Sequence, residues 1–263
     1  MFGICDLSLV PCRSQPFDKS EMVTQLLFGE HFRILEEQDK WILIKIAFDG
    51  YECWIDKTQY KKISEEEYNL LSDEPQRLSF ELIKKIGKSE NILLGSVLPD
   101  FKKGKFRIAG NEYVFSGKTI LTDFNQKPAT RSKQLSKRTS IIGIAKLYLN
   151  SPYHWGGRSP CGIDCSGFTQ MVFKLNGIQL PRDAWQQAEK GEALNFIEEA
   201  QKGDLAFFDN EEGKIVHVGI IIDKNKIIHS SGKVRIDTLD HYGIFNSDSG
   251  KYSHNLRVIK KIL

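Results

Sequence analysis

A cysteine and two histidines stand where nucleophilic catalysis would need them. Cys165 lies in the run Asp-Cys-Ser-Gly-Phe and precedes a stretch with apolar residues at helical spacing, so it is predicted to begin a helix. Backbone N–H groups and the positive end of a helix favour an anion there, which would stabilise a thiolate. His217 and His229 follow in strand-like sequence. Together these residues predict a cysteine hydrolase.

Three short segments downstream are predicted to form an antiparallel meander of strands. They read GDLAFFD, KIVHVGIIID and KIIHSS, and turn sequences separate them. The histidines are twelve residues apart (229 − 217), so one hairpin can bring them side by side. His217 would then accept the proton of Cys165, and His229 would hold the His217 ring in the useful tautomer.

Four ordered motifs resemble the catalytic domain of NlpC-type cysteine peptidases, which cleave bacterial cell-wall peptides. They are YHWGGRSPCGIDCSGFTQ, GDLAFF, HVGI and IIHSSG, and the resemblance extends from about Thr139 to residue 263. It implies a papain-like α+β fold in which Cys165 is the nucleophile, His217 the base and His229 the third polar residue. It also implies that Tyr153 helps to stabilise the oxyanion.

Zinc binding is a second chemistry that these residue types allow, because His154 and Cys161 are further potential ligands near Cys165. However, no second close pair of ligands follows the two cysteines. A metal on Cys165 would also quench the nucleophile. We therefore expect no metal and no cofactor, with Cys161 as a structural loop residue and His154 as an exposed neighbour of the cleft.

The chain ahead of this domain is predicted to be mainly β. An alternating stretch that ends in DGYECWID resembles a bacterial SH3-like domain, which we place at residues 1–62. A short helix over SEEEYNLLS follows, and residues 76–125 are again rich in β-formers and glycine turns, which predicts a second SH3-like barrel. Residues 126–138 are polar and basic and are predicted to be a solvated linker, with Thr139 or Ser140 capping the next helix.

Two SH3-like domains before an NlpC-type domain resemble the γ-D-glutamyl-L-diamino acid endopeptidases of the dipeptidyl-peptidase VI type, which recycle murein peptides. The resemblance implies that the first barrel closes the cleft and that the site binds the free amine of an N-terminal L-Ala. A buried ammonium needs an opposite charge and acceptors. The candidates are Asp183, which should also cap a short helix, Asp164 and Ser166 beside the nucleophile, and Glu30 and Tyr51 of the first barrel.

The composition is that of an ordinary globular protein, with 263 residues, 40% of them hydrophobic and 27% charged, and a net charge of +3. The basic residues are scattered, which argues against nucleic-acid binding. The N-terminus lacks the features of a signal peptide, and no stretch approaches the roughly 18 to 20 apolar residues of a spanning helix. Five dispersed cysteines indicate no disulfide framework. We expect a cytoplasmic protein without membrane partners that acts on short murein-derived peptides.

Two other functions stay open at this point. One is a wall-binding SH3-like scaffold whose catalytic domain is inactive, although the intact Cys165, His217, His229 and Tyr153 argue against it. The other is an amidase or acyltransferase on the same scaffold, which would share the nucleophile but use another substrate. The sequence also leaves open whether the third residue of the peptide is lysine or diaminopimelate.

Overall fold

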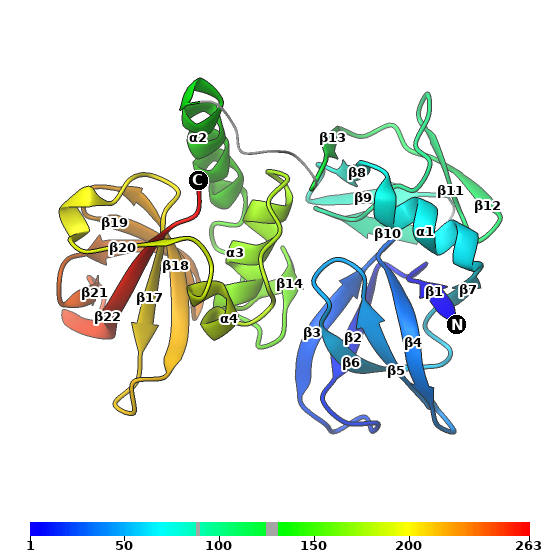
Figure 1. Ribbon diagram of the computed structural model, residues 1–263, viewed down its shortest axis with the longest axis horizontal. Coiled ribbons are helices and arrows are strands. Elements are labelled where there is room, and N and C mark those ends of the chain that lie inside the picture. The colour runs from blue at the N-terminus through cyan, green and yellow to red at the C-terminus, as the bar shows by residue number, and fades with distance from the viewer. Residues whose placement is uncertain (88–89, 125–130) are drawn as a thin grey trace. The chain divides into compact units, whose positions relative to one another are not determined.

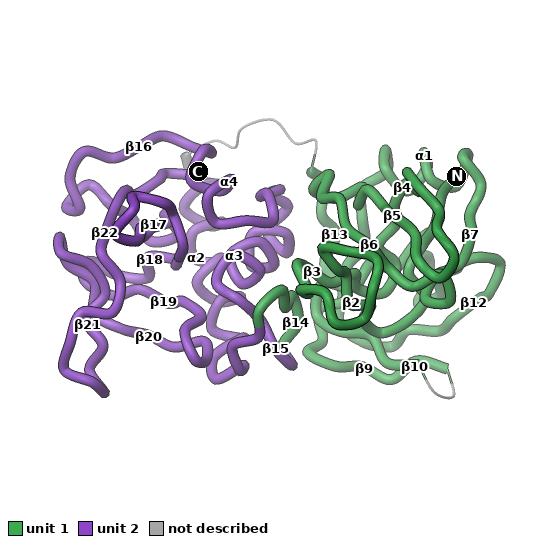
Figure 2. The backbone as a smooth tube through the Cα atoms, turned by 90° about the horizontal axis from the view of Figure 1, so that it is seen from below, with its two compact units in different colours: residues 1–125, 155–160 green, residues 126–154, 161–263 purple. Residues whose placement is uncertain are grey.

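The computed structural model describes residues 1–87, 90–124 and 131–263, and it divides the chain into two compact units (Figure 1, Figure 2). Unit 1 comprises Met1–Asn125 and Trp155–Pro160, and unit 2 comprises Gln126–His154 and Cys161–Leu263. A short piece of the longest catalytic motif, WGGRSP, therefore belongs to the N-terminal unit. That assignment was not foreseen from the sequence.

Unit 1 begins with an antiparallel sheet of seven strands in the order β3-β2-β6-β5-β4-β1-β7. Alternation sets its inner face, since Ile42, Ile44 and Ile46 are fully buried and Lys45 between them is exposed. The β-structure predicted for residues 1–62 is confirmed. The strands are β1 (Phe2–Ile4), β2 (Leu9–Arg13), β3 (Met22–Leu27), β4 (His31–Glu37), β5 (Trp41–Ile46), β6 (Glu52–Asp56) and β7 (Lys61–Ile63).

The predicted connecting helix is α1 (Glu65–Asp73), which Ser64 caps by accepting a hydrogen bond from the backbone of Glu67 at 3.1 Å. In the described part of the region that follows, six short strands form three antiparallel pairs, β9 with β10, β11 with β12, and β8 with β13. These strands are β8 (Gln76–Ser79), β9 (Ile83–Ile86), β10 (Glu90–Leu93), β11 (Lys105–Ile108), β12 (Asn111–Val114) and β13 (Thr119–Thr122).

The second β-region shares its core with the first. Ile4 and Phe28 from the first sheet pack in one cluster with Ile92, Phe106 and Ile108. A set of short two-stranded pairs buries little apolar surface alone, so this shared cluster accounts for the two β-regions forming one unit. The remaining strand of unit 1 is β14 (Arg158–Ser159).

Over its described residues, unit 2 combines three α-helices with a seven-stranded antiparallel sheet (Figure 1). The strand order is β16-β22-β17-β18-β19-β20-β21, and β21 also pairs with β22. The predicted α+β architecture is confirmed. The helices are α2 (Arg131–Leu147), α3 (Cys165–Lys174) and α4 (Ala184–Ala188), with a short 3-10 helix at Ile197–Glu199. The strands are β15 (Gly162–Ile163), β16 (Glu192–Leu194), β17 (Leu205–Asp209), β18 (Ile215–Asp223), β19 (Lys226–Ser231), β20 (Lys233–Leu239), β21 (Gly243–Asn246) and β22 (Lys251–Lys261).

The prediction of a linker at residues 126–138 is wrong for its described part, which belongs to α2. This helix begins at Arg131 and not at Thr139 or Ser140, while residues 126–130 lie outside the described residues. Arg138 is not solvated, because it is buried and donates to Asp204 at 2.8 Å. Part of this basic, linker-like stretch therefore belongs to a helix, and Arg138 has a buried partner far along the chain.

Candidate active site

Cys165 is the first residue of α3, as its sequence predicts. Asp164 is the N-cap, and its carboxylate accepts a hydrogen bond from the backbone of Gly167 at 2.6 Å. The apolar residues Phe168 and Met171 on α3 are fully buried, which anchors the helix in the core of unit 2. The thiol is therefore held at a capped, rigid helix start.

The Cys165 thiol is protonated at neutral pH, which differs from the thiolate expected from the helix start alone. Burial raises the pKa of Cys165 to about 12, and the neighbouring Asp164 adds to the rise. The backbone N–H groups of Val218 and Ser166 and the guanidinium of Arg182 act in the opposite direction without reversing it. Since Val218 follows His217 on β18, these N–H contacts also bring the sulfur to the strand that carries His217.

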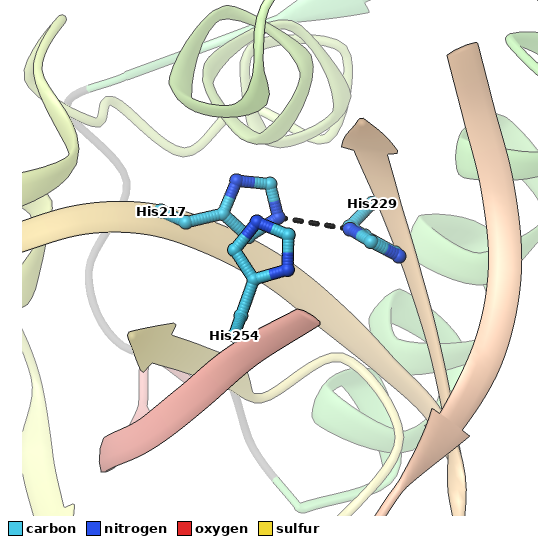
Figure 3. Close-up of side chains that lie close together, drawn as sticks. All are labelled: His217, His229 and His254. Carbon is cyan, nitrogen blue, oxygen red and sulfur yellow. Dashed lines mark hydrogen bonds between the residues drawn. The ribbon is translucent and has the colours of Figure 1, made fainter. Parts of the chain in front are cut away.

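The two predicted histidines lie side by side, which confirms the hairpin argument. His217 Nε2 and His229 Nδ1 are 2.8 Å apart and hydrogen-bonded (Figure 3). Strands β18 and β19 pair with Gly219 opposite His229, so His217 lies diagonally across the ladder. Both rings are buried. Burial, followed by the nearby His229 and His254, holds the pKa of His217 well below its usual range, so this ring is neutral at pH 7.

The hydrogen-bonded row continues beyond His229 to two residues that sequence reasoning missed. His229 Nε2 lies 3.0 Å from Asp237 Oδ2, and Arg235 Nη2 donates to Asp237 Oδ1 at 2.9 Å. Burial alone would raise the pKa of Asp237, but the hydrogen bonds from His229 and Arg235 outweigh it and lower that pKa. The sequence could have pointed to Asp237 and Arg235, because a tight turn after KIIHSS places VRID on the next strand beside His229.

His254 on β22 is a third histidine of the site, and nothing in the sequence pointed to it. Its ring stacks on that of His217, with centroids 4.0 Å apart and an interplanar angle of 24° (Figure 3). Burial lowers the pKa of His254 to about 4, and His229 adds to this effect. The contact comes from pairing of β22 with β17, two strands far apart in the chain.

The three histidines offer nitrogen atoms that all lie within 4.8 Å of one another, a spacing that merits comparison with a metal site. Two nitrogen ligands on tetrahedral zinc, each about 2.05 Å from the ion, stand about 3.3 Å apart. The 2.8 Å between His217 and His229 is shorter and matches a hydrogen bond. The geometry thus favours a proton-transfer site over a metal centre.

Tyr153 approaches the same site from the loop that precedes β15. Its backbone N–H donates to Gly232 at 2.9 Å, and it forms a parallel bridge with Ile163. Burial first, and then the neighbouring Cys165 and Asp164, raise the pKa of Tyr153. The hydroxyl therefore stays protonated and is available as a donor near the sulfur.

Asp164 and Ser166, predicted as rim contacts for a substrate amine, are both buried and bonded to Arg182. The guanidinium donates to Asp164 Oδ2 at 2.5 Å and to Ser166 Oγ at 2.9 Å. Arg182 is itself 2% exposed. These contacts give the two residues a role in holding the start of α3, and an incoming amine would have to displace a buried guanidinium to reach them.

Asp183 is the N-cap of α4, as predicted, and the side chain of Gln186 accepts from its backbone N–H at 3.1 Å. It is half-buried, and the next large side chain, Trp185, is exposed. Among the predicted amine-binding residues of unit 2, Asp183 is the one with a partly accessible position.

Glu30 and Tyr51 belong to unit 1, and Glu30 is already paired. Its side chain is 2% exposed, and Arg158 donates to its two oxygens at 2.8 and 3.0 Å. The backbone of Leu27 donates to the same carboxylate at 2.9 Å. An ammonium would have to compete with these donors. Tyr51 is half-buried and packs against the core of the first sheet.

Arg158 comes from the segment 155–160, and sequence reasoning missed it. It is fully buried and also donates to the carbonyl of Gln25 at 2.7 Å. The segment approaches β3 closely, because a Cβ on Gly156, whose φ is +74°, would lie 2.4 Å from the carbonyl oxygen of Met22. The glycines before the arginine in GGRSP could have indicated a close approach of this segment to another backbone.

The five cysteines are all free thiols, and among the described residues no helix is long and apolar enough to cross a membrane. His154 is exposed, as predicted, and Cys161 is exposed as well.

A helix-start cysteine facing a histidine-bearing antiparallel sheet defines a papain-like cysteine peptidase. Residues 150–248 match the NlpC/P60 family, and residues 12–59 match the bacterial dipeptidyl-peptidase SH3 domain. The chain is 33% identical to gamma-D-glutamyl-L-lysine dipeptidyl-peptidase of Bacillus subtilis (strain 168) over 79% of its own length and 71% of the relative. It is 27% identical to dipeptidyl-peptidase 6 of Lysinibacillus sphaericus, with 86% and 88% covered. The chain belongs to the NlpC/P60 family.

The fold has a counterpart among solved structures. An NlpC/P60 family protein from Bacillus cereus ATCC 10987 superimposes with a TM-score of 0.81 over the full length of both chains, at 22% identity. That likeness covers the N-terminal unit as well as the catalytic one, so both belong to a shared architecture.

Proposed function

We propose that this cysteine peptidase cleaves the bond between γ-D-Glu and the diamino acid in free murein peptides of the form L-Ala-γ-D-Glu-diamino acid. The buried Cys165, whose sulfur contacts the backbone of Val218 beside His217, and the hydrogen-bonded pair of His217 and His229 carry the proposal, together with similarity to a gamma-D-glutamyl-L-lysine dipeptidyl-peptidase over both units of the chain. We also propose that the protein acts in the cytoplasm on peptides released from the wall.

The resting state is a neutral thiol beside a neutral imidazole, so the base must act during the attack. His217 takes the proton of Cys165 as the sulfur bonds to the γ-carbonyl carbon of D-Glu. Tyr153 and the backbone N–H groups at the start of α3 then donate to the oxyanion. The choice of base atom follows from the row of hydrogen bonds, since Nε2 of His217 is engaged with His229 and Nδ1 remains.

The intermediate collapses when His217 returns its proton to the leaving amine of the diamino acid. The C–N bond breaks, and an acyl thioester stays on Cys165. His217 then removes a proton from water, whose oxygen attacks the thioester carbon, and the dipeptide L-Ala-D-Glu leaves as the thiol is restored.

Recognition of the free amine is proposed for Asp183, since a carboxylate pairs with an ammonium. Asp164, Ser166, Glu30 and Tyr51 remain candidates, although the existing partners of the first three make them better suited to support the site than to touch the amine.

The test compares L-Ala-γ-D-Glu-diaminopimelate with its N-acetylated form, with products identified by mass spectrometry. We expect release of L-Ala-D-Glu from the free peptide and little from the acetylated one, because a site built for a buried polar group rejects an analogue lacking it by up to about 10⁴-fold. Cys165→Ala is the inactive control. Efficient release of peptides from intact sacculi, or equal cleavage of both peptides, would contradict the proposal.

A further inference from the structure

We propose that Asp237 is a positioning residue for the peptidase reaction, and that its carboxylate sets the proton positions of both active-site histidines. Only the kinetic test of this inference rests on the proposed function, since the proton positions can be measured without substrate. Asp237 does not touch the thiol. It acts through His229 on His217, the group that would move the proton.

The contacts form one continuous row. Asp237 Oδ2 lies 3.0 Å from His229 Nε2, and His229 Nδ1 lies 2.8 Å from His217 Nε2. His229 and Asp237 are 1% and 3% exposed, so water does not compete for these atoms. Each distance is that of a good hydrogen bond, and each bond holds one proton.

Asp237 determines which way those protons point. An ionised carboxylate can only accept, so His229 must carry its proton on Nε2. A neutral His229 then has a lone pair on Nδ1, which requires His217 to donate from Nε2. The remaining nitrogen of His217, Nδ1, therefore carries the lone pair that a base needs.

The reverse arrangement would block catalysis. If His229 donated from Nδ1, then Nε2 of His217 would be the acceptor and its Nδ1 would hold the proton. His217 would then have no free lone pair with which to accept the proton of Cys165. If its Nε2 were protonated instead, that N–H would face the N–H of His229. Only an acceptor behind His229 prevents this state, and Asp237 is the acceptor that the structure provides.

Asp237 is itself held by the hairpin and by Arg235. In the β19–β20 ladder, His229 lies opposite Arg235 and Ile227 lies opposite Asp237, so all four side chains share one face. Arg235 donates to Asp237 Oδ1 at 2.9 Å, and a second contact of Arg235 reaches the exposed Asp248 at 2.9 Å. The guanidinium keeps the carboxylate ionised and oriented.

The first measurement needs no substitution. In protein labelled with ¹⁵N at histidine, two-bond ¹H–¹⁵N spectra at pH 7 report which ring nitrogen carries each proton. We expect the proton on Nε2 in both His229 and His217. His254, which stacks on His217, provides an internal comparison because the hydrogen bonds from Asp237 run through His229 to His217. A proton on Nδ1 of His229 in the unmodified protein would overturn the proposal, whatever the substrate of the enzyme.

The second measurement is kinetic. Asp237→Asn keeps the shape but offers an amide that can donate to His229, so the reversed arrangement becomes populated. The equivalent change in a serine protease triad costs about 10⁴ in kcat, and here the carboxylate is one imidazole further away, so we expect kcat to fall by about 10² to 10³ with KM little changed. The ¹⁵N spectra of the variant should show His217 with its proton moved to Nδ1.

Asp248→Asn is the matched control, because it removes a carboxylate from Arg235 without touching the histidine row. We expect its kcat and spectra to match those of the unmodified protein. A folded Asp237→Asn variant whose kcat lies within about threefold of the control would refute the positioning role. If the unmodified protein failed to cleave the peptide, the proposed function would fail, while the spectra would still decide the proton positions.

Discussion

The buried pair of Arg158 and Glu30 allows a quantitative test of how the segment 155–160 is held in unit 1. The change is Glu30→Gln, which keeps the side-chain size and removes the charge. Arg158 would then lie fully buried without the Glu30 carboxylate, since both of its contacts to Glu30 are lost as charged hydrogen bonds, although the Asp49 carboxylate still acts on it. Burial alone would lower the pKa of Arg158, but Glu30 and, more weakly, Asp49 raise it above its usual value, so the guanidinium stays charged.

The expected magnitude follows from the burial of both partners. Breaking a buried ion pair on one side costs about 3 to 5 kcal/mol, because a desolvated charge loses its partner, and the Asp49 carboxylate near Arg158 places the expected loss at the lower end of that range. A loss of about 3 kcal/mol lowers the folding equilibrium constant of unit 1 by more than about 100-fold, and with an m-value of about 2 kcal/mol/M it lowers the urea midpoint by about 1.5 M. The double variant Glu30→Leu with Arg158→Met should recover most of this loss, since well-packed apolar residues replace such pairs at little cost.

The assay is urea unfolding followed by tryptophan fluorescence in a Trp185→Phe background. Trp185 is the tryptophan of unit 2 and is exposed, whereas Trp41, Trp54 and Trp155 all belong to unit 1. The fluorescence change then reports on unit 1. Glu21→Gln is the control, because Glu21 bonds Trp155 of the same segment at an exposed position and its loss should cost less than about 0.5 kcal/mol.

Two results would refute the reasoning. A Glu30→Gln midpoint within about 0.3 M of the parent would mean that the pair contributes little to the stability of unit 1. A double variant as unstable as the single one would mean that the loss arises from packing and not from the lost attraction between Arg158 and Glu30.

The other predictions concern catalysis and its pH dependence. Alkylation of Cys165 by iodoacetamide in substrate-free enzyme should speed up about tenfold per pH unit from 7 to 10, because its raised pKa leaves little thiolate at neutrality, and a plateau near pH 7 would contradict this. His217→Ala should abolish turnover and His229→Ala should slow it, since proton transfer is lost in the first and orientation in the second; rates equal to the parent would show that the rings are structural. Because the pKa of His217 is depressed, activity should persist in mild acid and fall only as pH drops through that low value. His254→Ala should move this acid limb to higher pH by admitting water to the His217 ring, whereas His254→Phe should not. Asp183→Ala should raise KM for the free-amine peptide and reduce discrimination against the acetylated one; unchanged KM would remove Asp183 from the amine site.

Local patterns were enough to place much of the candidate site. The N-cap aspartate and the helical spacing after Cys165 predicted the start of α3, and alternation predicted the strands that carry His217 and His229. The twelve-residue separation predicted their contact. Each of these features depends on hydrogen bonds and side chains within about one turn or one hairpin, which a sequence displays directly.

The features that were missed depend on distant parts of the chain. His254 reaches His217 through the pairing of β22 with β17, and Arg138 of α2 has a buried partner at Asp204. Arg158 is buried against Glu30, more than a hundred residues away. Charged residues look solvated in a sequence, and only the fold decides which of them find a partner.

The thiol of Cys165 illustrates the division between sequence and tertiary structure. The sequence by itself placed Cys165 at a helix start and the two histidines side by side on a hairpin, because these features follow from local propensity and register. Tertiary structure alone decided the protonation of the site. Burial raises the pKa of Cys165 and lowers that of His217, so the pair rests neutral although the helix start favours a thiolate. Desolvation depends on everything that packs around a group, and it outweighs the local field of one helix end.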